Sequence, residues 1–438
     1  MKPLKSKFAI LALFASIWSS SAIQAQNEIQ YINLEVALEL GGANNLTIQQ
    51  YKYQQKLASA DQTRSKEWWL PQIYTGTRSH LLAGNAMNAD GAIFTDVERQ
   101  SLWLGIGLNA TWDFGNGIFK ANAARLTSEA AAYKTEAEKN NALLRIVNIY
   151  YDLLAAQLYF TAYEELAKQA DTIASQIAIQ VNAGMRFESD ELLARSNSNH
   201  LRVEMLNAQK QVNSKSASMV RLLNLNPKTN LVLVDSVLVP ILLAIDEKEG
   251  ALFDVAYRNR PELKSIKLEL KSLNIERKTT TSALWLPKLR VGAYNSSFGD
   301  WMRDDSFSPT SEINTSLVWK IPMGRIIYGG SVKQFNARIT LHENHLAQIT
   351  AQVGEQVITA KKEIKISKEQ MKLALKGSQL SFNALRQSLE RQKLGTLRPL
   401  DILQAQESYI ESKLDYLKAV GSHNKAQYAY YVGIGNSL

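Results

Sequence analysis

The sequence carries the same arrangement twice. Residues 68–73 read Trp-Trp-Leu-Pro-Gln-Ile, and residues 284–289, which lie 216 positions later, read Leu-Trp-Leu-Pro-Lys-Leu. Farther along, Gly184 returns 211 positions later as Gly395, again with an aspartate six residues after the glycine. The repeats of solenoid proteins are about 20–50 residues long, so this much longer period is a duplicated half-chain. The fold must therefore contain two copies of one module in equivalent environments.

Residues 1–25 have the layout of a secretory signal peptide. Three lysines precede an apolar run from Phe8 to Trp18, and a segment of small residues ends at Ala25. The run is shorter than the about 20 apolar residues of a membrane-spanning helix, so we expect cleavage after Ala25. No later segment reaches that length either. A secreted chain of this kind is either soluble or enters a membrane as β-strands.

The composition and the short motifs exclude several functions. The chain has no cysteine, so we expect no disulfide, thiolate metal site or cysteine nucleophile. A net charge of +9 over 438 residues is mild, and no basic run alternates with aromatic residues, so no nucleic acid is expected as a partner. His342 and His345 lack the spacing of a zinc helix, and Gly115 and Gly117 lack the third glycine of a dinucleotide loop. We predict no enzyme, no cofactor and no metal.

The first half reads as helix, two strands and two helices. A helix is predicted over residues 34–68, ended by a proline, and a strand over 73–77 is followed by a loop of small residues. Residues 101–112 alternate strictly between apolar and other side chains, which is typical of a strand. A proline-free segment with helical periodicity then covers 118–183, and after a glycine a second helix covers 189–225.

The second half repeats this plan. It predicts a helix over 252–284, strands over 289–293 and 313–321, and helices over 328–394 and 400–431. We therefore divide the chain into a signal peptide (1–25), a first repeat (26–226), a linker of irregular structure (227–250) and a second repeat (251–438).

Four strands of about 8–11 residues per chain have the length that a tilted strand needs to cross a bilayer. Four strands cannot close a membrane barrel, and an open edge in lipid is prohibitively costly, so several chains would have to share one barrel. Two, three or four chains would give eight, twelve or sixteen strands. A soluble four-stranded sheet stays open as an alternative. In a membrane, aromatic residues would mark its interfaces: Trp103, Trp112, Trp301 and Trp319, with Tyr74 and Tyr294.

The order and spacing of several short motifs resemble the TolC family of outer-membrane efflux proteins, over essentially all of the mature chain. The motifs are Arg-Asn-Arg-Pro-Glu-Leu at 258–263, the helix-Leu-Pro-strand junctions at Pro71 and Pro287, and the Gly-Thr-x3-Leu-Asp-x-Leu pattern at 395–403. No single motif is very specific, and the resemblance depends on their combination.

The resemblance implies a mainly α fold with a membrane β part. It implies a homotrimer in outer-membrane lipid, with a twelve-stranded β-barrel that continues into a long periplasmic α-helical barrel. Such a protein would be the passive exit duct of a tripartite efflux pump or a type I secretion system. It would contact a periplasmic adaptor (membrane fusion) protein directly and an inner-membrane RND or ABC pump indirectly. Cargo and pump class stay open.

In this family the periplasmic hairpin tips form a constricted iris and meet the adaptor. Carried over to this chain, the iris and adaptor residues are Gly184, Arg186, Asp190, Gly395, Thr396, Arg398 and Asp401. A ring of aspartates from three chains would favour cations at the aperture. The chain departs from the pattern at Leu397, where a basic residue is expected, and at Gln404, where some members have a second acid.

Two alternatives stay open. Asp190 and Asp401 also suit the capping of a helix N-terminus, a role that could coexist with the iris. The chain as a whole could instead be a secreted, soluble coiled-coil scaffold or adhesin, which shares the signal peptide and the long helices but needs no membrane strands.

Overall fold

The computed structural model describes residues 29–438 except for 89, 244–251, 301–306 and 395–397. The predicted signal peptide, 1–25, lies outside the described residues. The chain divides into two compact units. One contains the described residues up to Gly41, with Ile149–Leu238 and Ser381–Leu417, and the other contains Gly42–Asn148, Val239–Leu380 and Lys418–Leu438. Each half of the sequence therefore contributes to both units.

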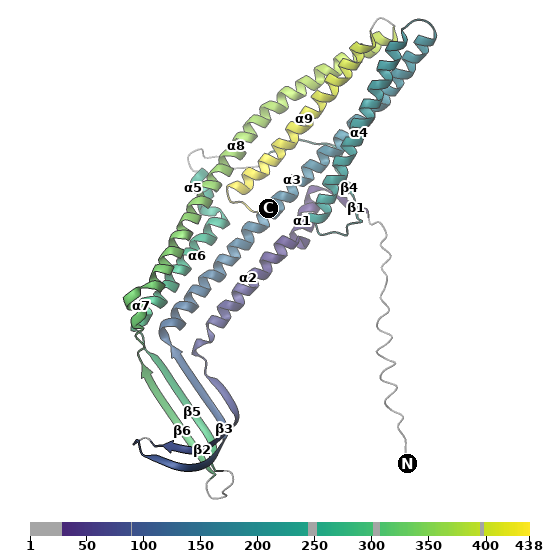
Figure 1. The fold of residues 1–438 in the computed structure, drawn as a ribbon. Helices are drawn as coiled ribbons and strands as arrows, with labels where there is room; N and C mark the ends of the chain where they lie inside the picture. The colour runs from purple at the N-terminus through teal and green to yellow at the C-terminus, as the bar shows by residue number, and fades with distance from the viewer. Residues whose placement is uncertain (1–28, 89, 244–251, 301–306, 395–397) are drawn as a thin grey trace, which may run out of the picture. The chain divides into compact units, whose positions relative to one another are not determined.

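Helices make up most of the chain (Figure 1). Four of the described helices are long, with 69 residues in α3, 64 in α8 and 35 each in α4 and α9. No helix among the residues described combines the length and the apolar character that crossing a membrane requires. The helices are α1 Leu34–Asn44, α2 Leu46–Ser65, α3 Phe114–Asn182, α4 Glu188–Leu222, α5 Leu252–Asn259, α6 Pro261–Arg277, α7 Met323–Tyr328, α8 Gly330–Lys393 and α9 Pro399–Gly433.

The first helix of each repeat is broken, so the single helices predicted over 34–68 and 252–284 are wrong. In the first repeat Asn45 separates α1 from α2, and its Oδ1 accepts hydrogen bonds from the backbone N–H groups of Thr47 (3.0 Å) and Ile48 (3.2 Å). An asparagine that caps a helix in this way starts a new helix. In the second repeat Pro261 is the first residue of α6, where its missing N–H costs nothing.

An antiparallel sheet of four strands lies in the second unit, in the order β2-β3-β5-β6 (Figure 1). The strands are β2 Gln72–Met87, β3 Ile93–Asp113, β5 Lys288–Gly299 and β6 Ser308–Val318. The first two have 16 and 21 residues, so the predicted length of 8–11 residues and the predicted loop of small residues are wrong for them. A β-bulge between Gly84 and Ala86 lets the pairing continue through those small residues.

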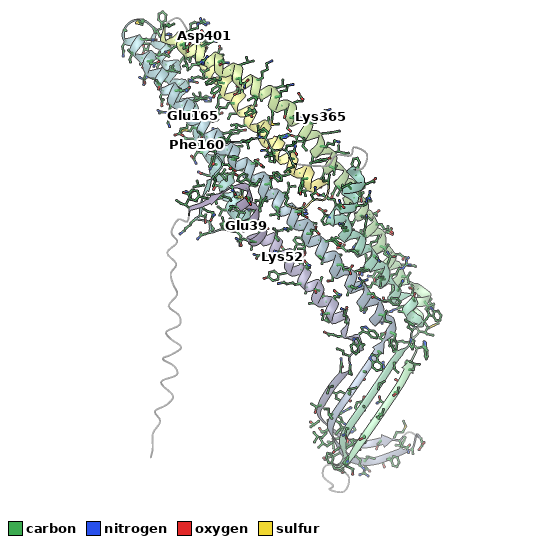
Figure 2. All side chains as sticks on the ribbon, turned by 180° about the vertical axis from the view of Figure 1, so that it is seen from behind. Glu39, Lys52, Phe160, Glu165, Lys365 and Asp401 are labelled. Atoms are coloured by element: carbon green, nitrogen blue, oxygen red, sulfur yellow. The ribbon has the colours of Figure 1, made fainter. Side chains whose placement is uncertain are left out.

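The second unit also has a helical core. Ala256 and Leu263 from α5 and α6 pack against buried residues of α8 and α9, such as Val357 and Tyr430. Arg260, between α5 and α6, is buried and holds this packing together. Its guanidinium donates to the backbone oxygen of Val432 (3.2 Å) and to Gln356, and it lies 3.5 Å from the Glu262 carboxylate. Lys52 of α2 and Lys365 of α8 are exposed on the helices (Figure 2), and so are apolar side chains such as Leu57 and Leu373.

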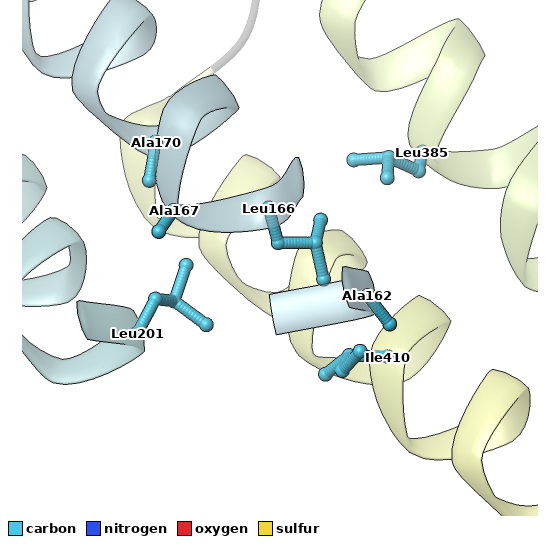
Figure 3. Packing of buried hydrophobic residues seen from close by; sticks show 7 residues of the cluster. All are labelled: Ala162, Leu166, Ala167, Ala170, Leu201, Leu385 and Ile410. Carbon is cyan, nitrogen blue, oxygen red and sulfur yellow. The ribbon is translucent and has the colours of Figure 1, made fainter. Parts of the chain in front are cut away.

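The first unit packs parts of four helices together (Figure 3). Its main cluster combines small and branched residues: Ala162, Leu166, Ala167 and Ala170 of α3, Leu201 of α4, Leu385 of α8 and Ile410 of α9. A second cluster combines residues of the same α3 with Ala194 of α4 and Ile402 of α9. The unit also contains a parallel pair of short strands, β1 Ile29–Ile32 and β4 Asn230–Leu233. Strand β4 lies in the linker predicted over 227–250.

Candidate functional site

The turn between α3 and α4 is built around Gly184, which has a φ of +71°. Met185 N–H donates to the oxygen of Gln180 (2.8 Å), and Gly184 N–H donates to the oxygen of Val181 (2.9 Å). These two bonds are the Schellman pattern that ends a helix, and the residue in the left-handed conformation is usually glycine. Gly184 therefore turns the chain at the tip of this hairpin, as the sequence predicted.

Arg186 and Asp190 face each other across the start of α4. Arg186 Nη1 lies 4.0 Å from Asp190 Oδ2, and Arg186 Nε donates to the side chain of Gln180 at the end of α3. Only 10 % of the Arg186 side chain is exposed. The arginine thus joins the two helices of the hairpin and keeps a positive charge beside the aspartate.

The equivalent turn between α8 and α9 is described in part. Gly395 and Thr396 lie outside the described residues. Arg398 and Asp401 are described, and Asp401 lies in the first turn of α9 (Figure 2). Arg398 Nη2 is 3.4 Å from Asp401 Oδ1, and its side chain is 82 % exposed. Both hairpins therefore pair their aspartate with an arginine of the same turn, although the arginine precedes it by four residues in the first and by three in the second.

The start of α4 shows how Asp190 stabilises this helix, which the sequence analysis left open between capping and an iris role. Its N-cap residue is Phe187, which has no side-chain hydrogen bond to the helix, and Asp190 lies three residues farther on. Asp190 shares the first turn with Glu188 and Glu191. These carboxylates therefore stabilise the helix through its positive N-terminal end rather than as N-caps.

Apolar side chains surround both tips, a feature that the sequence analysis missed. Met185, Phe187 and Leu192 are exposed on the first hairpin, and Leu394 and Leu400 on the second. Phe187 is 80 % exposed. A signal was present in the sequence, because these residues interrupt the polar turns next to Gly184 and Gly395.

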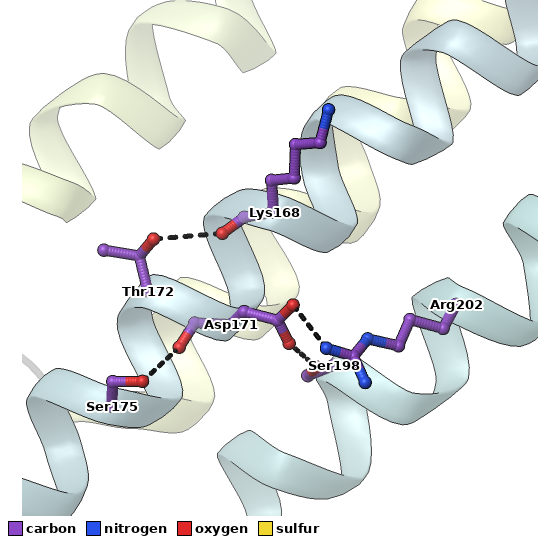
Figure 4. Close-up of polar contacts among 6 residues, drawn as sticks. All are labelled: Lys168, Asp171, Thr172, Ser175, Ser198 and Arg202. Atoms are coloured by element: carbon purple, nitrogen blue, oxygen red, sulfur yellow. Dashed lines mark hydrogen bonds and ion pairs between the residues drawn. The ribbon is translucent and has the colours of Figure 1, made fainter.

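A polar network holds α4 against α3 below the first tip (Figure 4). The carboxylate of Asp171, on α3, accepts hydrogen bonds from the Ser198 hydroxyl and from Arg202 Nη2 (2.7 Å), both on α4. These two donors hold the pKa of Asp171 below its usual value. Farther along α4, Asn197 donates to Gln406 of α9 (3.2 Å), which connects the two hairpins within this unit.

The four-stranded sheet has one apolar and one polar face. The register aligns Ile73 with Leu108 and Ala293 with Ile313, so alternate residues of all four strands share a face. The large apolar residues of that face are exposed: Ile73, Leu81, Leu104, Ile106, Leu108, Ile313 and Leu317. Arg78, Arg290 and Glu312 lie on the other face. Strands β2 and β6 are the edges of the sheet in the described part of the chain.

The aromatic residues singled out in the sequence divide between these two faces. Trp112 lies on the apolar face, opposite Leu289, and its Nε1 donates to the backbone oxygen of Trp69 (2.6 Å). Trp103 lies on the polar face, opposite Phe298. Trp319 is exposed directly after the end of β6, and Trp301 lies outside the described residues. The described residues contain no cluster of histidine and acidic side chains suited to a metal ion.

Comparison with known proteins gives one family and several similar structures. Residues 32–225 match the family model described as outer membrane efflux protein. No curated protein sequence matches the chain. The CmeC outer membrane channel of Campylobacter jejuni is 15 % identical with a TM-score of 0.78, and the match covers 92 % of this chain and 85 % of that one.

Two further structures are similar to the same extent. The outer membrane protein VceC of Vibrio cholerae is 13 % identical with a TM-score of 0.77, over 92 % of this chain and 96 % of that one. The open state of the MtrE outer membrane channel of Neisseria gonorrhoeae is 15 % identical with a TM-score of 0.74, over 92 % and 89 %. At such low identity these structures establish the fold, which agrees with the mainly α architecture with a β part expected from the sequence.

Proposed function

Because this chain belongs to the TolC family of outer membrane efflux proteins, we propose that it is the passive exit duct of a tripartite efflux pump or a type I secretion system. It is an outer-membrane channel with a periplasmic helical part, and it transports rather than catalyses. The alternative of a secreted scaffold or adhesin is therefore wrong. The energy for export would come from an inner-membrane RND or ABC pump.

The observation that carries the proposal is the sheet with two different faces and two open edges. An apolar face that exposes Ile106 and Ile313 suits lipid, and the polar face suits an aqueous lumen. The edges at β2 and β6 cannot stay open in lipid, since each unpaired backbone group costs several kcal/mol there. Further copies of the chain would pair these edges. Three copies would give the twelve-stranded barrel of the family and, below it, a periplasmic α-helical barrel.

The hairpin tips would be the gate and the adaptor contact. Each chain has one carboxylate at the start of α4 and another at the start of α9. In a trimer these carboxylates would narrow the entrance and favour cations there. The exposed apolar residues beside them suit contact with a periplasmic adaptor protein, whose binding would shift the tip helices outward. The residues assigned to this role are Gly184, Arg186, Asp190, Gly395, Thr396, Arg398 and Asp401.

The remaining assignments concern the membrane interface and the domains. Trp112 and Trp319 lie near the ends of β3 and β6 and would belong to one interfacial girdle, and Trp301 would belong to the other. Trp103 lies on the face assigned to the lumen, so it would belong to neither girdle. We assign 26–226 and 251–438 to the two repeats, 227–250 to the linker and 1–25 to the signal peptide.

The first test is the mass of the detergent-extracted protein, measured by light scattering and corrected for bound detergent. The expected result is three copies of the chain, recovered from the outer-membrane fraction. A monomer or dimer that needs no detergent would refute the shared barrel.

The second test is ion conductance in planar bilayers. Asp401→Ala and Asp190→Ala should each reduce the cation preference of the channel. Glu407→Ala is the matched control, because Glu407 is an exposed carboxylate on α9 beyond the first turn. If neither aspartate variant differed from this control in conductance or cation preference, the acidic ring would be abandoned.

A further inference from the structure

The two repeats join the sheet to their long helix in different ways. In the first repeat β3 ends at Asp113 and α3 begins at the next residue, Phe114. In the second repeat β6 ends at Val318 and α8 begins at Gly330, and the short helix α7 lies between them (Figure 1). No residue of α7 is buried against the described part of the chain. The second repeat therefore has an uncovered segment at the junction of sheet and helices that the first repeat lacks.

A tryptophan fills the corresponding junction in the first repeat. A Cβ atom built on Gly117 would lie 2.1 Å from Cδ2 of Trp68, and the ring centroids of Trp68 and Phe114 are 6.0 Å apart. In the second repeat the position of Trp68 is taken by Leu284. A Cβ atom built on Gly330, at the start of α8, would meet no atom of the described residues within 4 Å. A hollow of about 660 Å³, lined in part by Leu284, lies at this open junction.

The polar wall of the hollow combines two cations with hydroxyl groups. These residues are Thr280, Thr281, Ser282, Arg325 and Lys333. Gly329, with a φ of +62°, turns the chain between the two cations. Its N–H donates to the oxygen of Arg325 (3.0 Å), and its oxygen accepts from Lys333 N–H (3.0 Å), so each cation is one helical turn away from it. Among the described lining residues none is acidic. Such a wall suits a phosphate, which pairs with cations and accepts hydrogen bonds from hydroxyls.

Exposed apolar side chains surround the hollow. Trp285, which lines it, is 77 % exposed, and Ile326 and Tyr328 of α7 are also exposed. In the register Lys288, which follows Trp285 closely, pairs with Val318 at the end of β6. The hollow thus lies at the end of the sheet where the strands meet the helices. Aromatic and basic side chains together are typical of the boundary between lipid tails and head groups.

We propose that this hollow binds the phosphate of an anionic phospholipid in the periplasmic leaflet of the outer membrane. Arg325 and Lys333 would pair with the phosphate, and the hydroxyl groups of Thr281 and Ser282 would donate to its oxygens. The acyl chains would lie along Trp285 and the apolar side chains of α7. The proposal rests on the proposed function, because the helical end of the sheet must face the periplasm. A neighbouring copy of the chain that covered α7 would exclude the lipid.

The test compares two lipids on the full chain in detergent by native mass spectrometry. Phosphatidylglycerol has a net negative charge, whereas phosphatidylcholine has the same phosphate diester but no net charge. The wild type should retain one phosphatidylglycerol per chain and bind it roughly tenfold more tightly than phosphatidylcholine, because two cations face the head group. Glycerol 3-phosphate in about a hundredfold excess should not displace the lipid, because the soluble compound has no acyl chains to bury.

Substitutions assign the parts of the site. Arg325→Gln and Lys333→Gln should each weaken phosphatidylglycerol binding about fivefold, a factor that equals about 1 kcal/mol. Trp285→Ala should weaken the binding of both lipids alike and keep their ratio. The matched control is Arg338→Gln, because Arg338 is an exposed cation on α8 that is not among the residues lining the hollow. It should leave both affinities unchanged, whereas a diffuse attraction to the basic surface would make the three charge variants equal.

Four outcomes would overturn the proposal: equal affinity of the wild type for the two lipids, displacement by glycerol 3-phosphate, no effect of either charge substitution in the hollow, or an equal effect of the control. The wild-type comparison decides even if a variant fails to assemble. Light scattering and conductance on the same preparation separate this result from the fate of the duct. A conducting trimer without lipid preference would refute the site alone, whereas lipid preference in a chain that forms no trimer would refute the duct alone.

Discussion

Leu201→Ala should loosen the hairpin of α3 and α4 by a predictable amount. Leu201 is 6 % exposed, and its side chain is directed at α3 (Figure 3). Buried leucine-to-alanine substitutions cost about 2–5 kcal/mol, and the cost depends on how far the cavity collapses. Ala167 and Ala170 already approach closely in the same cluster, and neither has a long side chain that could refill the space. We therefore expect about 3 kcal/mol, near the middle of that range.

Native-state hydrogen exchange is the suitable assay, because the proposed membrane oligomer would not unfold reversibly in two states. A loss of about 3 kcal/mol should speed exchange of the protected amides near Leu201 and of the α3 segment that it contacts by roughly a hundredfold. The control is Leu206→Ala, the same substitution on the same helix at a side chain that is 61 % exposed. It should cost at most about 0.5 kcal/mol.

Both variants replace leucine by alanine within α4, so the small difference in helix propensity cancels between them. The reasoning would be refuted if Leu201→Ala changed exchange by less than about threefold. It would also be refuted if the two variants had the same effect. Equal effects would mean that the outer surface of α4 is covered in the assembly as thoroughly as the core cluster.

Three further predictions follow from single residues. The hydrogen bonds to Asp171 lower the pKa of its carboxyl group in the folded chain. The contribution of this group to stability is therefore complete above about pH 4 and is lost as the pH falls through the folded pKa. Asp171→Asn should remove this pH dependence from hydrogen exchange in α4. Gly184→Ala should lower the free energy of local opening at the turn, measured by hydrogen exchange, by about 1–2 kcal/mol. The whole cost comes from the backbone conformation, since nothing lies within 4 Å of the added Cβ. Arg260→Met should lower the free energy of opening of α5 and α6, measured by hydrogen exchange, by roughly 2–4 kcal/mol, because Val432 and Glu262 lose a buried partner.

The long elements could be predicted from the sequence because each is specified by many residues. Helix α3 was predicted over 118–183 and covers Phe114–Asn182, since its period recurs over dozens of positions. The breaks were missed because each depends on one residue. Pro261 was visible inside the predicted helix 252–284, and its preference for the first helical turn would have placed the break correctly.

The contacts between aromatic residues on different strands could not be predicted from the sequence. Alternation in β3 already puts Trp103 and Trp112 on opposite faces, because their numbers differ in parity. The sequence could not show that Tyr74 lies beside both Trp103 and Tyr294 across three strands. That contact depends on the register between β2, β3 and β5, and register is fixed by side-chain packing over the whole sheet. This aromatic cluster is therefore a property of the folded sheet alone.

The two repeats keep the same scaffold and differ at the tips. Each hairpin has its aspartate six residues after the glycine, but the arginine follows the glycine by two residues in the first repeat and by three in the second. One residue near a helix start turns a side chain by about 100°. Arg186 therefore inserts between α3 and α4 and is largely buried, whereas Arg398 stays in solvent, where such a pair contributes little. The carboxylates of Asp190 and Asp401 are consequently restrained to different degrees.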